Sequence, residues 1–262
     1  MGGEDASGVA PVTAPAPTAV TLEPLFLALG SVALAAYARA PRGRAAPAWR
    51  KALFGLGLLL VVGAVNSPLE TIAVNYLLVI HLLQNVMIAD WAAPLLLLGL
   101  TPEMRVGLGR GFPRVLVAVT RPKVALPAWL VGWYGIHLAL VYDYALRHAW
   151  ALNLEHLLLL VLGLLFWWPV LSDEPHGLEP ALAAAYLGAA FVGSAFLGLA
   201  LTFSPTPFYD YYVEAPRLWG LSPAKDQNLG GVLMTGEQAI IFLVAIAYFV
   251  SRLVPQEETS RG

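Results

Sequence analysis

The sequence predicts an all-α integral membrane protein, a bundle of about seven transmembrane helices with the N-terminus outside and the C-terminus in the cytoplasm. Three observations lead to this fold class. Hydrophobic residues make up 58% of the 262 residues and charged residues only 12%, whereas a soluble domain carries about 25% charged residues. Apolar runs recur at roughly the 20 residues that a helix needs to cross a bilayer. The Lys and Arg residues gather in a few loops, and this asymmetry orients the helices.

The first element is the segment 1–20, which mixes Ala, Pro, Thr and Gly without hydrophobic periodicity and is expected to be a disordered tail. It lacks the basic start and continuous apolar core of a signal peptide. The transmembrane domain follows over 21–254, and residues 255–262 form a short cytoplasmic tail. The seven predicted spans cover approximately residues 22–39, 51–66, 72–100, 124–143, 149–171, 179–203 and 230–253.

Orientation follows from the positive residues, because Lys and Arg in short loops are retained on the cytoplasmic side. Twelve of the 15 lie in the loop after the first span, in the loop after the third span and at the C-terminal end. The opposite side receives only Arg147, Arg217 and Lys225. The same side carries the long loop 204–229, whose aromatic residues suit the headgroup layer, so we expect this loop to cap the outer mouth.

Composition also excludes several functions. The chain has no cysteine, which rules out disulfides, thiolate metal sites and cysteine nucleophiles. The net charge of −2 offers no basic surface, so no nucleic-acid partner is expected. No GxSxG, HExxH or P-loop pattern occurs where it would be needed, and we do not expect an enzyme.

Three histidines on three different predicted spans stand out, because an ionisable side chain in lipid is costly and usually faces the bundle interior. At 1.5 Å per helical residue, His81, His137 and His156 all lie roughly 9–15 Å below the outer surface. Other polar or sulfur-bearing residues are expected at or above this layer: Gln84, Asn85, Asp143, Glu155, Met234, Glu237 and Gln238. The sequence therefore predicts a polar interior pocket that opens outward.

Imidazoles with a carboxylate or a thioether suit copper or zinc, and imidazole is also an axial haem ligand. The metal ligands expected from the sequence are His81, His156, His137, Glu237 and Met234. The alternative is that each histidine only forms hydrogen bonds between helices.

Three segments resemble, in order, the CtaG family of membrane proteins required for assembly of caa3-type cytochrome c oxidase. They are NSPLETIAVNYLLVIHLLQNVMIADWAAPLLLLG (66–99), YDYALRHAWALNLEHLLLLVLGLLFWWPVL (142–171) and DQNLGGVLMTGEQ (226–238). The resemblance implies a seven-helix protein of the bacterial plasma membrane that helps to form a copper centre of the oxidase. Its implied partners are the oxidase subunits and an extracytoplasmic copper chaperone, in addition to the lipid bilayer.

The family motifs map onto His81 and Gln84, onto His156, and onto Asp226 with Gln227. The family pattern has a second histidine four residues after the first, and this chain has Asn85 there. Asparagine is a poor copper ligand. The pocket therefore holds another metal, holds none, or uses His137, Glu237 or Met234 instead.

Two other functions remain open from the sequence. A redox membrane protein would ligate haem b, or bind a quinone, between facing histidines such as His81 and His156. A transporter would carry ions or protons on Asp and Glu residues near the midplane, but the two halves show no repeat. A retinal protein is excluded, because the span 230–253 contains no lysine.

Overall fold

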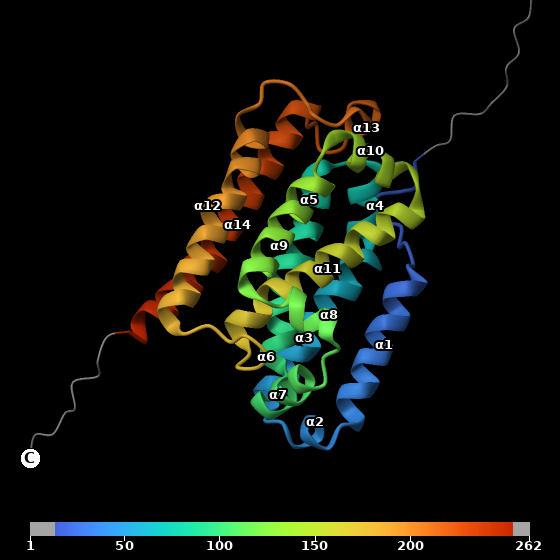
Figure 1. The fold of residues 1–262 in the computed structure, drawn as a ribbon. Coiled ribbons are helices and arrows are strands. Elements are labelled where there is room, and N and C mark those ends of the chain that lie inside the picture. Colours follow the sequence, from blue (N-terminus) through green and yellow to red (C-terminus); the bar gives the residue numbers. More distant parts are fainter. Residues whose placement is uncertain (1–13, 254–262) are drawn as a thin grey trace, which may run out of the picture.

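A computed structural model describes residues 14–253, and within this range all regular structure is helical. The helices run between two ends of an elongated bundle (Figure 1). One end, which we call the α13 end, holds α4 (Pro68–Asn75), α10 (Ala139–Arg147) and α13 (Asp210–Glu214). The other, the α7 end, holds α2 (Pro41–Ala45) and α7 (Pro102–Arg110). The chain descends from the α13 end before it enters α1, and it leaves the last helix toward the opposite end.

The described residues contain five helices long and apolar enough to cross a membrane. They are α3 (Ala48–Val65), the stack α5–η1–α6 (Leu78–Gly99), α11 (Ala149–Leu171), α12 (Pro180–Phe203) and α14 (Pro223–Ser251). The pair α9 (Pro122–Ile136) and α10 makes a sixth if it counts as one bent span. The apolar helix α1 (Pro24–Arg39) has 16 residues. The protein is thus an all-helical multi-pass membrane protein, and the count of seven stays a prediction.

The predicted span 72–100 is divided in the structure. Helix α4 ends at Asn75, and α5 (Leu78–Val86) begins after a two-residue break. A π-helical turn, η1 (Met87–Ala92), then leads into α6 (Ala93–Gly99). Pro94 lies just after this turn; because proline has no N–H to donate to the preceding turn, the wider turn accommodates it and the helix continues.

The predicted span 124–143 is bent. Helix α9 ends at Ile136, with His137 as its C-cap residue, and the axis of α10 lies at 68° to that of α9. The bend moves α10 across the α13 end of the bundle (Figure 1). His137 therefore sits at a helix end and not inside a continuous span.

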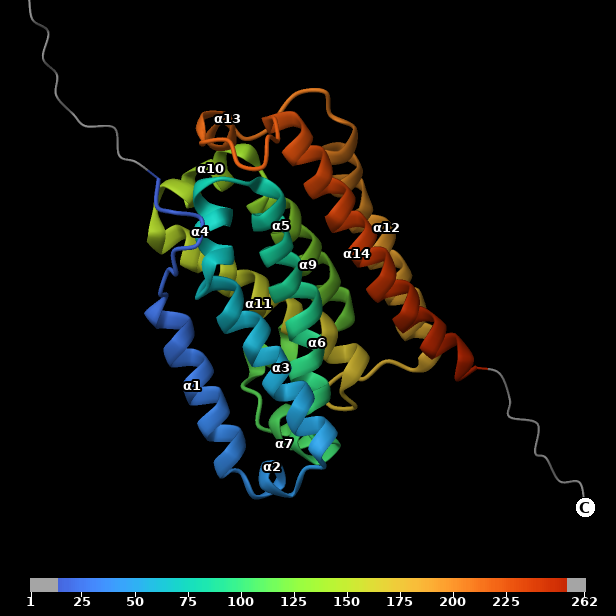
Figure 2. The same cartoon turned by 180° about the vertical axis from the view of Figure 1, so that it is seen from behind.

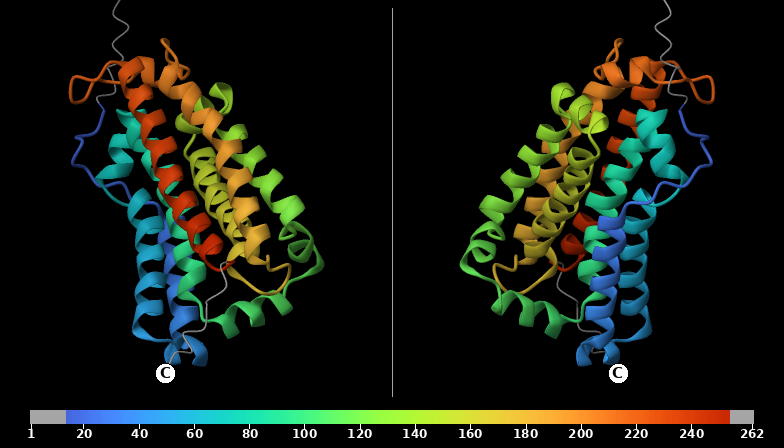
Figure 3. Two further views of the ribbon diagram at one scale, coloured as in Figure 1. Left: turned by 90° about the vertical axis from the view of Figure 1, so that its left-hand side faces the viewer. Right: turned by 90° about the vertical axis from the view of Figure 1, so that its right-hand side faces the viewer.

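Helices α12 and α14 pack side by side and are inclined to α1 and α3 (Figure 3). Small residues allow the close approach, as the sequence of span 179–203 predicts. A Cβ added to Gly231 of α14 would lie 2.5 Å from the backbone nitrogen of Thr202, and one added to Gly198 would lie 2.0 Å from Oγ1 of Thr235. The two helices could not pack this closely with side chains at these glycines.

At the α7 end, the acidic loop 172–179 docks on basic residues. Arg110 of α7 donates two hydrogen bonds to the Glu174 carboxylate, at 2.7 and 2.9 Å. These bonds hold the pKa of Glu174 below its usual value. His176 lies 2.8 Å from the carbonyl oxygen of Val117, just beyond the start of α8 (Arg114–Val119). The loop is therefore braced against the helices that carry the positive residues.

The two predicted tails fall largely outside the described residues, which exclude 1–13 and 254–262. The described part, 14–23, runs along α4. There the Thr71 hydroxyl donates to the carbonyl oxygen of Ala19 at 2.8 Å, and the backbone N–H of Glu23 donates to Asn66. This segment is therefore attached to the α13 end of the bundle.

Candidate functional site

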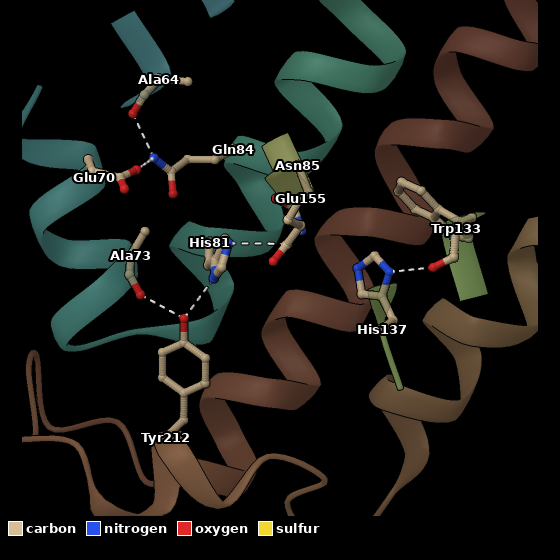
Figure 4. Close-up of polar contacts among 10 residues, drawn as sticks. All are labelled: Ala64, Glu70, Ala73, His81, Gln84, Asn85, Trp133, His137, Glu155 and Tyr212. Carbon is tan, nitrogen blue, oxygen red and sulfur yellow. Dashed lines mark hydrogen bonds and ion pairs between the residues drawn. The ribbon is translucent and has the colours of Figure 1, made fainter. Parts of the chain in front are cut away.

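Three histidines and one glutamate lie beneath the α13 end, and Figure 4 shows three of these residues, His81, Glu155 and His137. His81 is in the first turn of α5, Glu155 and His156 are adjacent on α11, and His137 ends α9. All four are buried, with relative exposures between 0% for His81 and 5% for His137. We call these four residues the histidine cluster. The structure thus brings together three of the five metal ligands expected from the sequence.

His81 is at the centre of the cluster. Its Nε2 lies 3.5 Å from Oε1 of Glu155, and its ring centroid lies 5.7 Å from that of His156. The ring of Tyr142 is next to two of the histidines, with its centroid 4.9 Å from that of His81 and 5.6 Å from that of His137. Tyr142 thus lies beside both His81 and His137.

Tyr212 fixes His81 from above. Its hydroxyl lies 2.7 Å from the carbonyl oxygen of Ala73 and 2.9 Å from Nδ1 of His81. A carbonyl oxygen only accepts, so the single hydroxyl hydrogen points to Ala73, and the hydroxyl accepts a hydrogen from Nδ1 of His81. Nε2 of His81 is then left facing the Glu155 carboxylate.

His137 is also held by a hydrogen bond through its Nδ1 atom. Its Nδ1 lies 2.7 Å from the carbonyl oxygen of Trp133, so Nδ1 carries a hydrogen. Its Nε2, like Nε2 of His81 and of His156, is buried without a hydrogen-bond partner in the part of the chain that the structure describes. Three imidazole nitrogens in one buried layer therefore remain available to a ligand.

The two motif residues after His81 connect the cluster to neighbouring helices. Gln84 donates through Nε2 to the carbonyl oxygen of Ala64 at 2.6 Å and to Oε2 of Glu70 at 2.8 Å. Asn85 donates through Nδ2 to Oε1 of Glu155 at 3.1 Å. Asn85 thus orients the carboxylate that faces His81, and Gln84 ties α5 to the junction between α3 and α4 (Figure 4).

Asp226 and Gln227 act as anchors at the start of α14. The Asp226 carboxylate accepts hydrogen bonds from the backbone N–H groups of Leu78 and Val79, at 2.8 and 2.9 Å. It satisfies donors that a helix start leaves free, and this start belongs to the helix that carries His81. Gln227 accepts from the N–H of Phe208 at 2.6 Å and donates to Thr206. Both residues therefore position the cluster and its cap.

Two expected ligands lie elsewhere. Glu237 accepts a hydrogen bond from the indole of Trp91, and the next residue, Gln238, donates to Asp90 at 2.9 Å. Asp90 is nine residues after His81, roughly 13 Å along the helix. Glu237 is thus in a second, deeper level, and the expectation that it shares the histidine layer is not met. Met234 is fully buried in an apolar cluster on α14 between the two levels.

Of the predicted loop 204–229, residues 204–222 cover the α13 end (Figure 2), and α14 already begins at Pro223. Two aromatic residues of this loop are buried. Tyr209 and Tyr212 are 1% and 2% exposed, and the Tyr209 hydroxyl donates to the carbonyl oxygen of His137 at 3.0 Å. Sequence reasoning assigned these aromatics to the headgroup layer and missed both roles. Their three-residue spacing, which places them on one face of a helical turn, is the signal that could have revealed them.

The cluster does not form a preassembled metal centre. Among residues 14–253, no three His, Cys, Asp or Glu side chains are arranged so that they could hold one metal ion together. The nitrogen and oxygen donors suit copper or zinc, but their present contacts are with the protein. Ion binding therefore requires these side chains to turn.

Comparison with known proteins gives one match to a protein family. A family model described as "Cytochrome c oxidase caa3 assembly factor (Caa3_CtaG)" matches residues 31–256, which is nearly the whole chain. No curated protein and no solved structure gave a match.

Proposed function

The chain belongs to the cytochrome c oxidase caa3 assembly factor family, and from this membership we propose that it supports formation of a copper centre in that oxidase through the histidine cluster. The membership itself implies association with oxidase components and points to a non-catalytic role. Copper is then cargo that the protein holds and passes on. An extracytoplasmic copper chaperone is its proposed donor.

The contact between His81 and Glu155 carries this proposal. With the hydrogen of His81 committed to Tyr212 through Nδ1, the lone pair of Nε2 faces a carboxylate oxygen 3.5 Å away. Two acceptors that face each other in a buried site repel unless a positive charge lies between them. A proton supplies this charge when the cluster is empty, and a metal ion supplies it when the cluster is loaded.

The chemistry of the donors supports copper. Neutral imidazole nitrogens bind copper well, and three such nitrogens lie in the cluster. Asn85 contributes its hydrogen bond to Glu155 and no strong ligand. His137 is the proposed third imidazole, reached when Tyr142 moves aside.

The incomplete arrangement suits a protein that transfers its metal. A site that must rearrange in order to bind also gives up its ion more readily than a rigid one, because part of the binding energy is spent on the rearrangement. The loop with Tyr209 and Tyr212 must move together with Tyr142, since both hydroxyls contact the cluster or its backbone.

We also propose the predicted topology for the bilayer, with seven crossings, the N-terminus outside and the C-terminus in the cytoplasm. The α7 end then faces the cytoplasm, in agreement with the positive residues of α2 and α7 at that end, Arg42, Arg44, Arg105 and Arg110. The histidine cluster lies beneath the outer surface of a bacterial plasma membrane. A copper chaperone outside the cell could reach it through the loop 204–222.

Metal analysis of the purified full-length protein tests the copper site. We expect wild-type protein loaded with copper and desalted to retain about one ion, and His81→Ala or His156→Ala protein to retain little. His148→Ala is the matched control, because His148 is an exposed residue between α10 and α11. Equal copper in wild-type protein and in both cluster variants would remove the site.

A further inference from the structure

A second level of polar residues lies against a cavity in the half of the bundle toward the α7 end. Helix α14 contacts α5 near the α13 end and then diverges from α3 and α6 (Figure 2). Between them is a cavity of about 900 Å³, lined by α3, α6, α11 and the second half of α14. Its walls are mostly apolar and aromatic, and include Trp49, Trp91, Leu98, Val244 and Tyr248. We call it the α6–α14 groove.

Two carboxylates lie at the deep end of this groove. Asp90 lines the groove and is 0% exposed, and Glu237, beside it, is 9% exposed. Within the described chain, Oδ1 of Asp90 and Oε2 of Glu237 have no hydrogen-bond partner. Unpaired acidic groups at this depth in a membrane are costly, and normally they face a positive or hydrogen-donating partner.

The basic side chains that line the groove donate to backbone carbonyl groups and not to the two carboxylates. Arg50 donates through Nη1 to the carbonyl oxygens of Leu98 and Leu100, at 2.6 and 2.7 Å. Arg105 donates through Nη1 to Leu97 and Leu100, at 3.0 and 2.8 Å. Both therefore satisfy carbonyl groups at the end of α6, where a helix leaves acceptors free. Neither forms an ion pair with Asp90 or Glu237 among the residues described.

We propose that the α6–α14 groove is the docking site for a transmembrane helix of an oxidase subunit that carries a Lys, Arg or protonated His at the depth of Asp90. This inference rests on the proposed function, since it takes the oxidase as the partner. Charge complementarity selects the occupant. The basic side chain would meet Asp90 and Glu237, and the apolar walls would pack against the rest of the helix.

A phospholipid is the competing occupant, and the charges of the groove disfavour it. Its acyl chains would lie against Asp90 and Glu237 and leave both carboxylates unpaired. Its phosphate would meet Arg50 and Arg105, whose Nη1 groups already donate to α6, although Nε of Arg105 has no partner in the described chain. A basic transmembrane helix pairs the free oxygens of both carboxylates, and a lipid does not.

Site-specific photo-crosslinking in membranes that contain the caa3 oxidase tests this proposal. A photoreactive amino acid replaces Val244, which lines the groove and is 66% exposed. The matched control position is Phe196 on α12, which is 65% exposed and lies outside the groove. We expect an adduct with an oxidase subunit from position 244 and none from 196. The crosslinked peptide should contain a Lys, Arg or His inside an apolar segment.

The isosteric double variant Asp90→Asn, Glu237→Gln should lower the adduct yield about tenfold or more at unchanged protein level, because a buried charge would lose its partner. Adducts with phospholipid only, equal yields from positions 244 and 196, or an unchanged yield in the double variant would overturn the proposal. His81→Ala, His156→Ala protein separates the two hypotheses. It should crosslink normally while oxidase copper falls, so each proposal can fail without the other.

Discussion

The hydroxyl of Tyr212 accepts a hydrogen bond from Nδ1 of His81 across 2.9 Å and thereby joins the loop 204–222 to the helix that carries the histidine. The same hydroxyl donates to the carbonyl oxygen of Ala73 on α4. One side chain therefore holds together a loop and two helices above the histidine cluster. The position of the loop and the orientation of the His81 ring are linked by this contact.

Removing that hydroxyl should loosen the cap. Tyr212→Phe leaves a buried carbonyl and a buried imidazole N–H unsatisfied, so we expect unfolding to become easier by about 1–3 kcal/mol. Thermal unfolding in detergent measures the change. Tyr211→Phe is the control, because Tyr211 is the adjacent residue and its side chain is only half buried. Equal melting temperatures for the two variants would show that the hydroxyl of Tyr212 contributes nothing.

The Asp226 carboxylate should stabilise the start of α5. Asp226→Ala removes the acceptor for the N–H groups of Leu78 and Val79, and loss of such a cap costs about 0.5–2 kcal/mol. The control is Lys225→Ala, since Lys225 precedes Asp226 on the same helix and its side chain is outside this contact. Thermal unfolding of both variants measures the effect. A loss of stability in Lys225→Ala but not in Asp226→Ala would contradict the prediction.

Close packing of α12 on α14 should be sensitive to one methyl group. Gly231→Ala places a Cβ 2.5 Å from the backbone of Thr202, which cannot turn away, so we expect a cost of about 1–3 kcal/mol. A Cβ at Gly236 on the same helix meets no neighbouring atom within 4 Å in the part of the chain described. Gly236→Ala should therefore leave the melting temperature nearly unchanged. A similar loss in both variants would contradict the packing argument.

Replacing Asn85 tests whether one more imidazole in the cluster increases copper binding. Its side chain points at Glu155 from the first turns of α5, close to the imidazole of His81. Asn85→His should add a fourth imidazole to the cluster and increase the copper that the purified protein retains after desalting. Asn75→His on α4 is the control for a histidine placed outside the cluster. Lower copper in Asn85→His than in wild-type protein would mean that the side chain of Asn85 supports the site in its present form.

Much of the fold could be predicted from apolar length, because a buried helix in lipid needs a long apolar run whatever its neighbours. The breaks between α4 and α5 and between α9 and α10 could not be predicted in this way. Residues 76–77 and 137–138 lie inside apolar runs and are themselves neither proline nor glycine, so hydropathy continues through them. They are set by tertiary contacts: Asp226 caps the new helix start at Leu78, and the Tyr209 hydroxyl donates to the freed carbonyl of His137.

The site could be predicted only in part, because the depth of a residue depends on where its helix begins. His81 and His156 were found by depth, since each is close to the outer end of its helix. Glu237 was placed too high because its span was counted from residue 230, whereas α14 begins at Pro223, roughly 10 Å further out. The polar residues from Asp226 to Asn228 read as loop in the sequence, but in the structure they are the first turns of a helix.

The copper content of the caa3 oxidase, isolated from cells in which this protein carries both His81→Ala and His156→Ala, tests the central claim most directly. We predict oxidase that keeps its haem and loses copper, with normal membrane levels of the variant protein and normal oxidase in cells with His148→Ala. Oxidase with full copper and full activity in the double variant would contradict the account.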